Sequence, residues 1–157
     1  MKNKTEKILI IAAIIIALIM AGVVMIKESG MDSSKVQEGY LEMIAEDGGI
    51  ERVQVTDAED VDFIKVCFNG DTTSDGSLEF AEGGYRIIMA QPDKEWHLYP
   101  DCGDLDKVRV GDSGNKFLTP AEDEQSELEQ VINKYIDTDD YKTECNWKEV
   151  IMDDIKN

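Results

Sequence analysis

Residues 85–99, YRIIMAQPDKEWHLY, predict the hairpin around which the fold is built. Two runs rich in β-branched and aromatic residues, 85–90 and 95–99, flank a turn at 91–94 that has proline near its start. Proline in that place favours a tight turn, so we expect the two runs to pair as antiparallel strands. The hairpin therefore indicates an antiparallel sheet.

The pattern of short β-rich runs extends over residues 49–110. Turn residues separate three further runs, which are 53–55, 61–68 and 107–110. The run 61–68 is apolar on both faces, as in a buried strand, but a helix is the alternative because several of its apolar residues also fall at helical spacing: Phe63, Ile64, Cys67 and Phe68. Short connections favour pairing of neighbouring runs, so we expect four to six antiparallel strands.

The segment before these runs, residues 34–47, predicts a helix. Ser34 and Gln37 match a capping box, and Gly48 and Gly49 follow as a stop. The apolar residues repeat at i, i+4, i+7 and i+8: Val36, Tyr40, Met43 and Ile44. We therefore expect an N-terminal helix that packs on the sheet.

The last third of the chain predicts two more helices. The first begins near Thr119, where Pro120 and Glu122 complete an N-terminal signal, and the second begins at Asn146. The first carries the clearest amphipathic stripe in the chain: Leu128, Val131, Ile132, Tyr135 and Ile136. Apolar helix faces need a surface to cover, and the sheet supplies one. The expected fold class is therefore α+β, with an antiparallel sheet packed by an N-terminal helix and two C-terminal helices.

An uninterrupted apolar run, residues 8–26, predicts a single transmembrane helix about 28 Å long. Lysines precede the run and only one follows closely, so residues 1–7 are expected in the cytoplasm and the rest outside. Residues 27–32 then form a linker and 33–157 an acidic extracytoplasmic α+β domain. The run is long for a cleaved signal and lacks a good cleavage site, which favours an uncleaved signal anchor in the cell membrane. Cleavage is the alternative, and the domain is then secreted.

The acidic charge limits the expected partners. The chain has a formal net charge of −18, and residues 1–26 contribute +2 of it, so the exported part carries −20. Such a field repels phosphate backbones and anionic lipid headgroups, so nucleic acid is not an expected partner. A protein with a basic face fits the charge better. The abundance of Ile, Lys, Asp and Glu suggests a bacterial source.

Residues 71–82, DTTSDGSLEFAE, resemble the calcium loop of an EF-hand. The resemblance implies oxygen ligands from Asp71, Thr73, Asp75, Ser77 (through its carbonyl), Glu79 and Glu82. Thr73 departs from the usual Asp or Asn, and the glycines at 83 and 84 would break the helix that normally follows. A solvated hairpin loop is therefore the competing interpretation.

The sequence contains no recognisable catalytic constellation. His97 is the single histidine, and it lies in the apolar run 96–99, where a core or sheet role is usual. No nucleophile, zinc-protease or nucleotide-binding motif accompanies it. A second acidic cluster is expected to be solvated: Asp101, Asp104, Asp106 and Asp112. We therefore expect neither an enzyme nor a cofactor, calcium apart.

The three cysteines, Cys67, Cys102 and Cys145, are an odd and sparse set, which is not typical of a disulfide framework. No CxxC or Cys/His ligand spacing indicates a structural zinc site. One disulfide is compatible with an oxidising compartment. Nothing in the sequence selects the pair.

Three hypotheses follow for the function, which no motif reveals directly. The first is a single-pass, membrane-anchored extracytoplasmic domain that acts as a binding or protein-interaction module. The second is a calcium-responsive extracytoplasmic domain that uses the loop at 71–82. The third is a structural component of an envelope or secretion assembly, whose apolar helix also packs against other helices through small residues.

Overall fold

The computed structural model describes residues 31–45, 47–74, 80–111, 116–142 and 147. The chain divides into two compact units, Met1–Gly30 and Met31–Asn157, and every described residue belongs to the second. Within this described part, no helix is long and apolar enough to cross a bilayer. The predicted span at residues 8–26 lies outside it and stays a prediction.

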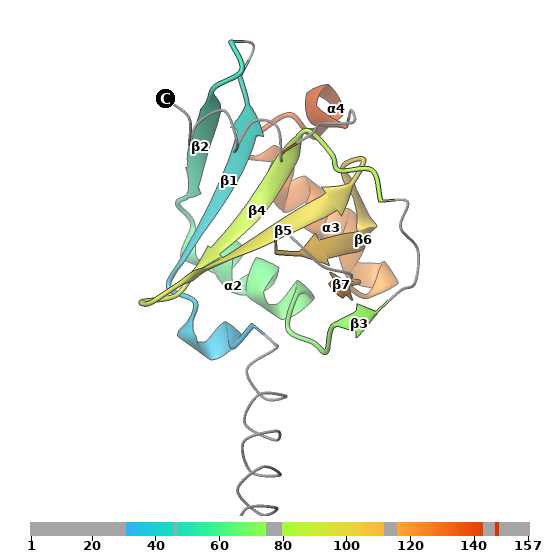
Figure 1. Cartoon of the computed structure of the whole chain (residues 1–157). Helices are drawn as coiled ribbons and strands as arrows, with labels where there is room; N and C mark the ends of the chain where they lie inside the picture. The colour runs from blue at the N-terminus through green and yellow to red at the C-terminus, as the bar shows by residue number, and fades with distance from the viewer. Residues whose placement is uncertain (1–30, 46, 75–79, 112–115, 143–146, 148–157) are drawn as a thin grey trace, which may run out of the picture. The chain divides into compact units, whose positions relative to one another are not determined.

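Seven antiparallel strands form one sheet in the described part, in the order β2-β1-β4-β5-β6-β7-β3 (Figure 1). The strands are β1 Glu38–Ile44, β2 Ile50–Val55, β3 Thr73–Ser74, β4 Tyr85–Ala90, β5 Glu95–Asp101, β6 Asp104–Val110 and β7 Lys116–Leu118. The predicted α+β class and antiparallel sheet are confirmed. The expected number of four to six strands is too low, because β3 and β7 are too short to leave a pattern in the sequence and β1 lies where a helix was expected.

β4 and β5 form the hairpin predicted from residues 85–99. Ile87 pairs with Leu98, and the Gln91 N–H donates to the Lys94 carbonyl at 2.8 Å to close the turn. β4 is a central strand with both faces buried. Successive side chains of a strand point to opposite faces, so Ile87 faces the core while Ile88 faces the other side of the sheet.

The helix predicted over residues 34–47 is wrong. A 3-10 turn, η1 Ser33–Lys35, leads into β1, which pairs with β2 on one side and β4 on the other. Leu41 and Met43 face the core, and Glu42 between them faces away. So short a run does not distinguish this period of two from helical spacing. Gly48, with φ of 84°, turns the β1–β2 hairpin instead of ending a helix.

Residues 61–68 do not form a strand, and their helical alternative is confirmed. Helix α2, Ala58–Cys67, begins after Asp57, whose carboxylate accepts the Glu59 N–H at 3.0 Å. Val61 and Ile64 are buried one turn apart. The buried apolar residues of this run therefore form one face of a helix, and not the two faces of a buried strand.

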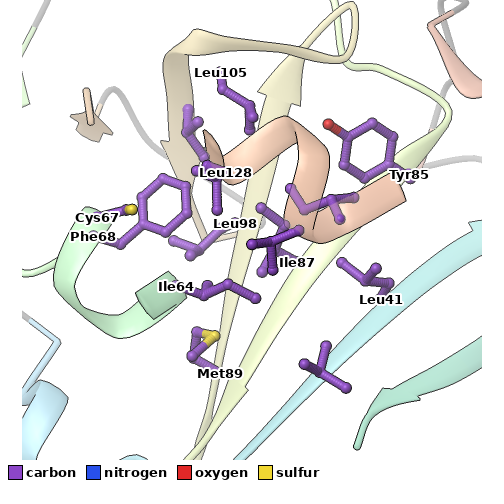
Figure 2. Packing of buried hydrophobic residues seen from close by; sticks show 14 of the residues in the cluster. Leu41, Ile64, Cys67, Phe68, Tyr85, Ile87, Met89, Leu98, Leu105 and Leu128 are labelled. Carbon is purple, nitrogen blue, oxygen red and sulfur yellow. The ribbon is translucent and has the colours of Figure 1, made fainter. Parts of the chain in front are cut away.

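The hydrophobic core lies between the sheet and two helices, α2 and α3 Glu122–Asn133, which cover the same sheet face (Figure 1). Figure 2 shows Ile64 of α2 and Leu128 of α3 meeting Ile87 and Leu98 of the central strands. All four side chains are completely buried. The packing of the two helices on the sheet therefore determines where the residues on their outer faces lie.

Helix α3 carries the predicted amphipathic stripe but starts later than predicted. Leu128, Val131 and Ile132 are buried, and the stripe is confirmed there. The helix begins at Glu122 after Ala121, which makes no side-chain capping bond, so Thr119 and Pro120 precede the helix rather than open it. A short helix that the sequence did not predict, α4 Thr138–Tyr141, follows it. The helix predicted from Asn146 lies outside the described residues, Trp147 apart.

Candidate functional site

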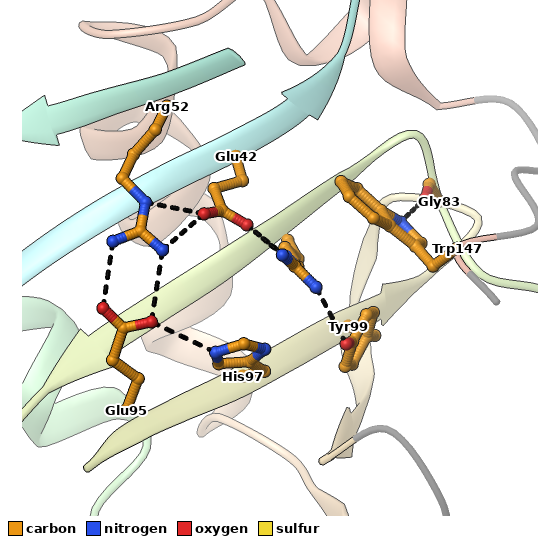
Figure 3. A network of polar contacts seen from close by, with 8 residues as sticks. Glu42, Arg52, Gly83, Glu95, His97, Tyr99 and Trp147 are labelled. Carbon is orange, nitrogen blue, oxygen red and sulfur yellow. Dashed lines mark hydrogen bonds and ion pairs between the residues drawn. The ribbon is translucent and has the colours of Figure 1, made fainter. Parts of the chain in front are cut away.

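The sheet face opposite the helices carries a buried ionic network (Figure 3). Glu42 of β1 is its centre: its carboxylate accepts from Arg52 of β2 at 2.6 Å and from Arg86 of β4. The side chains of Glu42 and Arg86 are only 4% and 6% exposed. Arg86 also donates to the Tyr99 hydroxyl of β5 at 3.1 Å. We call these four residues the arginine network.

One end of the arginine network, at Arg52, lies at the protein surface. Arg52 holds Glu95 through two bonds of 2.9 and 3.1 Å, and the His97 ring lies 3.3 Å from the same carboxylate. The bonds from Arg52 lower the pKa of Glu95, so this carboxylate stays ionised at neutral pH. A carboxylate that has a lowered pKa and accepts two hydrogen bonds from an arginine is a weak general base.

Trp147 closes the other end of the network. Its ring lies under the Arg86 guanidinium at 4.6 Å and edge-on to Tyr99, with ring centroids 6.2 Å apart. The indole N–H donates to the Gly83 carbonyl at 3.0 Å, and Trp147 is only 1% exposed. Arg86, Tyr99 and Trp147 thus share one packed cluster. The side-chain bonds of the network therefore link four neighbouring strands, β2, β1, β4 and β5.

An open groove lies on the other side of the molecule, between α3 and the start of β6. Its volume is about 410 Å³, and its walls combine acidic, neutral polar and apolar residues. We call it the acidic groove; its lining residues are Gly103, Asp104, Leu105, Asp106, Glu122, Gln125, Ser126, Glu129 and Lys142. Four of these nine residues are acidic, and one, Lys142, is basic.

Local structure explains this charge. Glu122, Ser126 and Glu129 are spaced at i, i+4 and i+7 on α3, so they line one helix face while Leu128 and Ile132 face the core. The turn between β5 and β6 then brings Asp104 and Asp106 to the opposite wall. The groove is therefore a product of the tertiary fold.

Lys142 is the one cation in the lining of the acidic groove. Its ammonium donates to Glu129 at 2.6 Å and lies 3.6 Å from Asp139. The hydrogen bond to Glu129 raises the pKa of Lys142, so the ammonium keeps its charge. Among the described residues, no cation forms a salt bridge with the other three groove carboxylates, Asp104, Asp106 and Glu122.

The six predicted calcium ligands are only partly described. Asp71 is exposed, Thr73 belongs to β3, and Glu82 binds Arg109 of β6 through an ion pair. The remaining three, Asp75, Ser77 and Glu79, lie outside the described residues. In the described part, no three side chains of His, Cys, Asp or Glu come together as a metal site requires. The calcium site stays a prediction.

The second acidic cluster of the sequence is divided by the fold. Asp104 and Asp106 line the acidic groove, whereas the Asp101 carboxylate accepts the Ala81 N–H at 3.1 Å. Asp112 lies outside the described residues. The sequence did not reveal Glu122, Glu129 or Lys142 as part of the same surface. The polar spacing of α3 is the only signal for the two glutamates, and it does not say what lies opposite.

Two of the three cysteines lie in the described part. Cys67 is a buried free thiol at the end of α2, and Cys102 is half-buried at the β5–β6 turn, where it has a φ of 50°. Cys145 lies outside the described residues. The single disulfide that the sequence allows stays a prediction.

No family model, curated protein or solved structure matches this chain.

Proposed function

We propose that this protein is a non-enzymatic, extracytoplasmic binding module, anchored in the cell membrane by residues 8–26, whose acidic groove takes lysine or arginine side chains of a basic partner. The observation that carries the proposal is the groove itself: an open hollow with four carboxylates and one ammonium. The chain's net charge of −18 supports it, because a strongly acidic surface attracts cationic partners and speeds their association.

The shape of the groove suits a basic side chain better than a small metal ion. The hollow is far larger than a coordination sphere, and Leu105, which is 7% exposed, belongs both to its lining and to the hydrophobic core. The methylene stem of lysine or arginine packs on such apolar surface while its charge meets carboxylates. The ammonium group of Lys142 already donates a hydrogen bond to the Glu129 carboxylate in this groove.

The test is a binding titration of the full chain in detergent micelles with fluorescein-labelled tetralysine. Replacing two groove carboxylates, Asp106→Asn with Glu122→Gln, should weaken binding about tenfold, since each lost charge contact contributes up to ~1 kcal/mol. The affinity of the unaltered chain should fall steeply as salt is raised.

The matched control is Asp123→Asn with Glu127→Gln. It makes the same charge change on exposed positions of α3 that do not line the groove. We expect binding within about twofold of the unaltered chain, since distant exposed charges are screened. Equal losses from both pairs, or binding that salt does not weaken, would reject the groove as the binding site.

The alternative proposal is a calcium-responsive domain that uses residues 71–82. One observation favours it: α2 ends at Cys67, so a helix precedes the loop, as the motif requires. Calcium bound only by the folded state should raise the melting temperature, and Asp71→Asn with Glu82→Gln should remove that rise. An unchanged melting temperature in millimolar calcium would eliminate this alternative.

A further inference from the structure

β2 is the one long edge strand in the described part of the sheet. Its six residues pair with β1 in unbroken register, and the strand contains no proline and no bulge. The opposite edge strand, β3, has only two residues. Natural sheets usually protect long edges with proline, bulges, covering segments or charged side chains, and of these devices β2 carries the charged residues Glu51 and Arg52. The exposed residues of β2 are Glu51, Arg52 and Gln54.

The hairpin bond determines which backbone groups of β2 point outward. The Ala45 N–H donates to the Gly49 carbonyl at 2.8 Å, and in an antiparallel ladder such facing pairs recur at every second residue. The backbone N–H and C=O groups of Glu51, Val53 and Val55 therefore point toward β1. The N–H and C=O groups of Ile50, Arg52 and Gln54 point outward. No backbone hydrogen bond from a described residue reaches these outward groups.

The side chain of Arg52 does not cover this edge. Its guanidinium is drawn over the sheet face, where it bonds Glu42 at 2.6 Å and Glu95 at 2.9 Å. Among the described residues, no hydrogen bond occupies the outward N–H and C=O groups of β2, and these groups match the ladder of an added strand. Recognition by strand addition uses such backbone groups for affinity and the neighbouring side chains for specificity.

We propose that the outer edge of β2 accepts an extended segment of another protein as an eighth, antiparallel strand, with an apolar residue opposite Val53 and a lysine or arginine opposite Glu51. Val53 is half-buried against the hydrophobic core, so an apolar neighbour would complete its burial. Glu51 lies two residues away on the same face and is exposed.

Charge decides between the candidate occupants. A second copy of the chain would bring together two domains of the same strongly negative sign, which disfavours self-pairing. A basic segment fits Glu51 and the net charge alike. The β2 edge is separated from β6, and so from the acidic groove, by three strands of the sheet. It is therefore a second surface, independent of the proposed function.

The test uses the full chain in detergent micelles and the fluorescein-labelled peptide Thr-Thr-Val-Thr-Lys-Thr. In the proposed pairing its fourth residue lies opposite Arg52 and points its N–H at β2, whereas the N–H of its third residue points away. Methylating the fourth nitrogen should weaken binding about tenfold, because it removes a backbone hydrogen bond. Methylating the third nitrogen should leave affinity within about twofold.

Two protein variants give the matching control. Gln54→Pro removes an outward N–H without touching the bonds to β1 and should weaken binding about tenfold, whereas Gln54→Thr keeps that N–H and should bind normally. Unchanged melting temperatures establish that both variants are folded. The groove pair Asp106→Asn with Glu122→Gln should bind the peptide normally, even if it also binds tetralysine normally and the groove proposal fails.

Four results would overturn the strand-addition proposal. These are no binding of the unmethylated peptide, equal losses from the two methylated peptides, full binding by Gln54→Pro, or a chain that dimerises through β2 instead of binding the peptide.

Discussion

At the residue scale, Glu42 is the central side chain of the arginine network, on the sheet face opposite the helices. Its carboxylate is buried between Arg52 and Arg86, which come from strands on either side of β1. Buried ion pairs add little net stability when complete, but losing one partner leaves uncompensated charge in a poorly solvated place. Glu42 is therefore more costly to replace than any exposed carboxylate of the sheet.

We predict that Glu42→Gln lowers the free energy of unfolding by about 3 kcal/mol, because two guanidinium groups lose their shared counter-charge. Urea unfolding followed by tryptophan fluorescence measures this directly. The control is Glu51→Gln on β2, which removes an exposed carboxylate and should change stability by less than about 0.5 kcal/mol. Similar effects of the two substitutions would contradict the role given to Glu42.

Cys67 gives a second prediction at this scale. Burial raises the pKa of its thiol to about 12. At pH 8 only about one molecule in 10,000 then carries the reactive thiolate at this position. Iodoacetamide should leave Cys67 unmodified in the folded chain and label it in urea, as peptide mass spectrometry can follow. Rapid labelling of Cys67 in the folded chain would show that the end of α2 is not packed as described.

At the element scale, one buried carboxylate ties the two long helices together. Asp60 in the first turn of α2 accepts from the Lys134 ammonium at 2.8 Å and the Tyr135 hydroxyl at 2.7 Å, just after α3 ends. Burial by itself raises the pKa of Asp60, but these hydrogen bonds outweigh it and the pKa is lowered. The charged form is therefore the one that the fold stabilises.

This clamp predicts how stability depends on pH. A carboxylate whose pKa is lowered in the folded state stabilises the fold above its ordinary pKa of 3.8, and that contribution is lost as the pH falls through the folded-state value. Asp60→Asn should therefore cost about 2 kcal/mol at pH 7 and progressively less below about pH 4. Thermal unfolding of both chains between pH 7 and pH 3 tests this. A difference that does not shrink on acidification would contradict the clamp.

At the scale of the whole molecule, the sequence predicted the elements that depend on a local turn signal or on local apolar spacing. The hairpin at 85–99 combines a proline turn with two β-rich runs, and the stripe of α3 spans three buried positions. The segment 34–47 was misread because its few apolar residues fit a helix and a strand equally, and only pairing with β2 and β4 makes it a strand.

The acidic groove and the arginine network could not be predicted from the sequence, for a related reason. Glu122 and Asp106 line one groove only because α3 packs beside β6. Arg52, Glu42 and Arg86 meet only because β2, β1 and β4 are neighbours in that order. Sequence spacing carries neither fact. The net charge, which needs no fold, predicts a basic partner, and that partner stays a prediction.

The central claim is that this acidic domain stands outside the cell on a membrane tether and acts by binding. Protease treatment of intact, wall-free cells that carry the chain with a C-terminal tag tests it most directly. We expect the chain in the membrane fraction and the tag lost on protease treatment, while a cytosolic marker survives. A tag that survives until the cells are lysed, or a chain recovered from the soluble cytosol, would contradict the account.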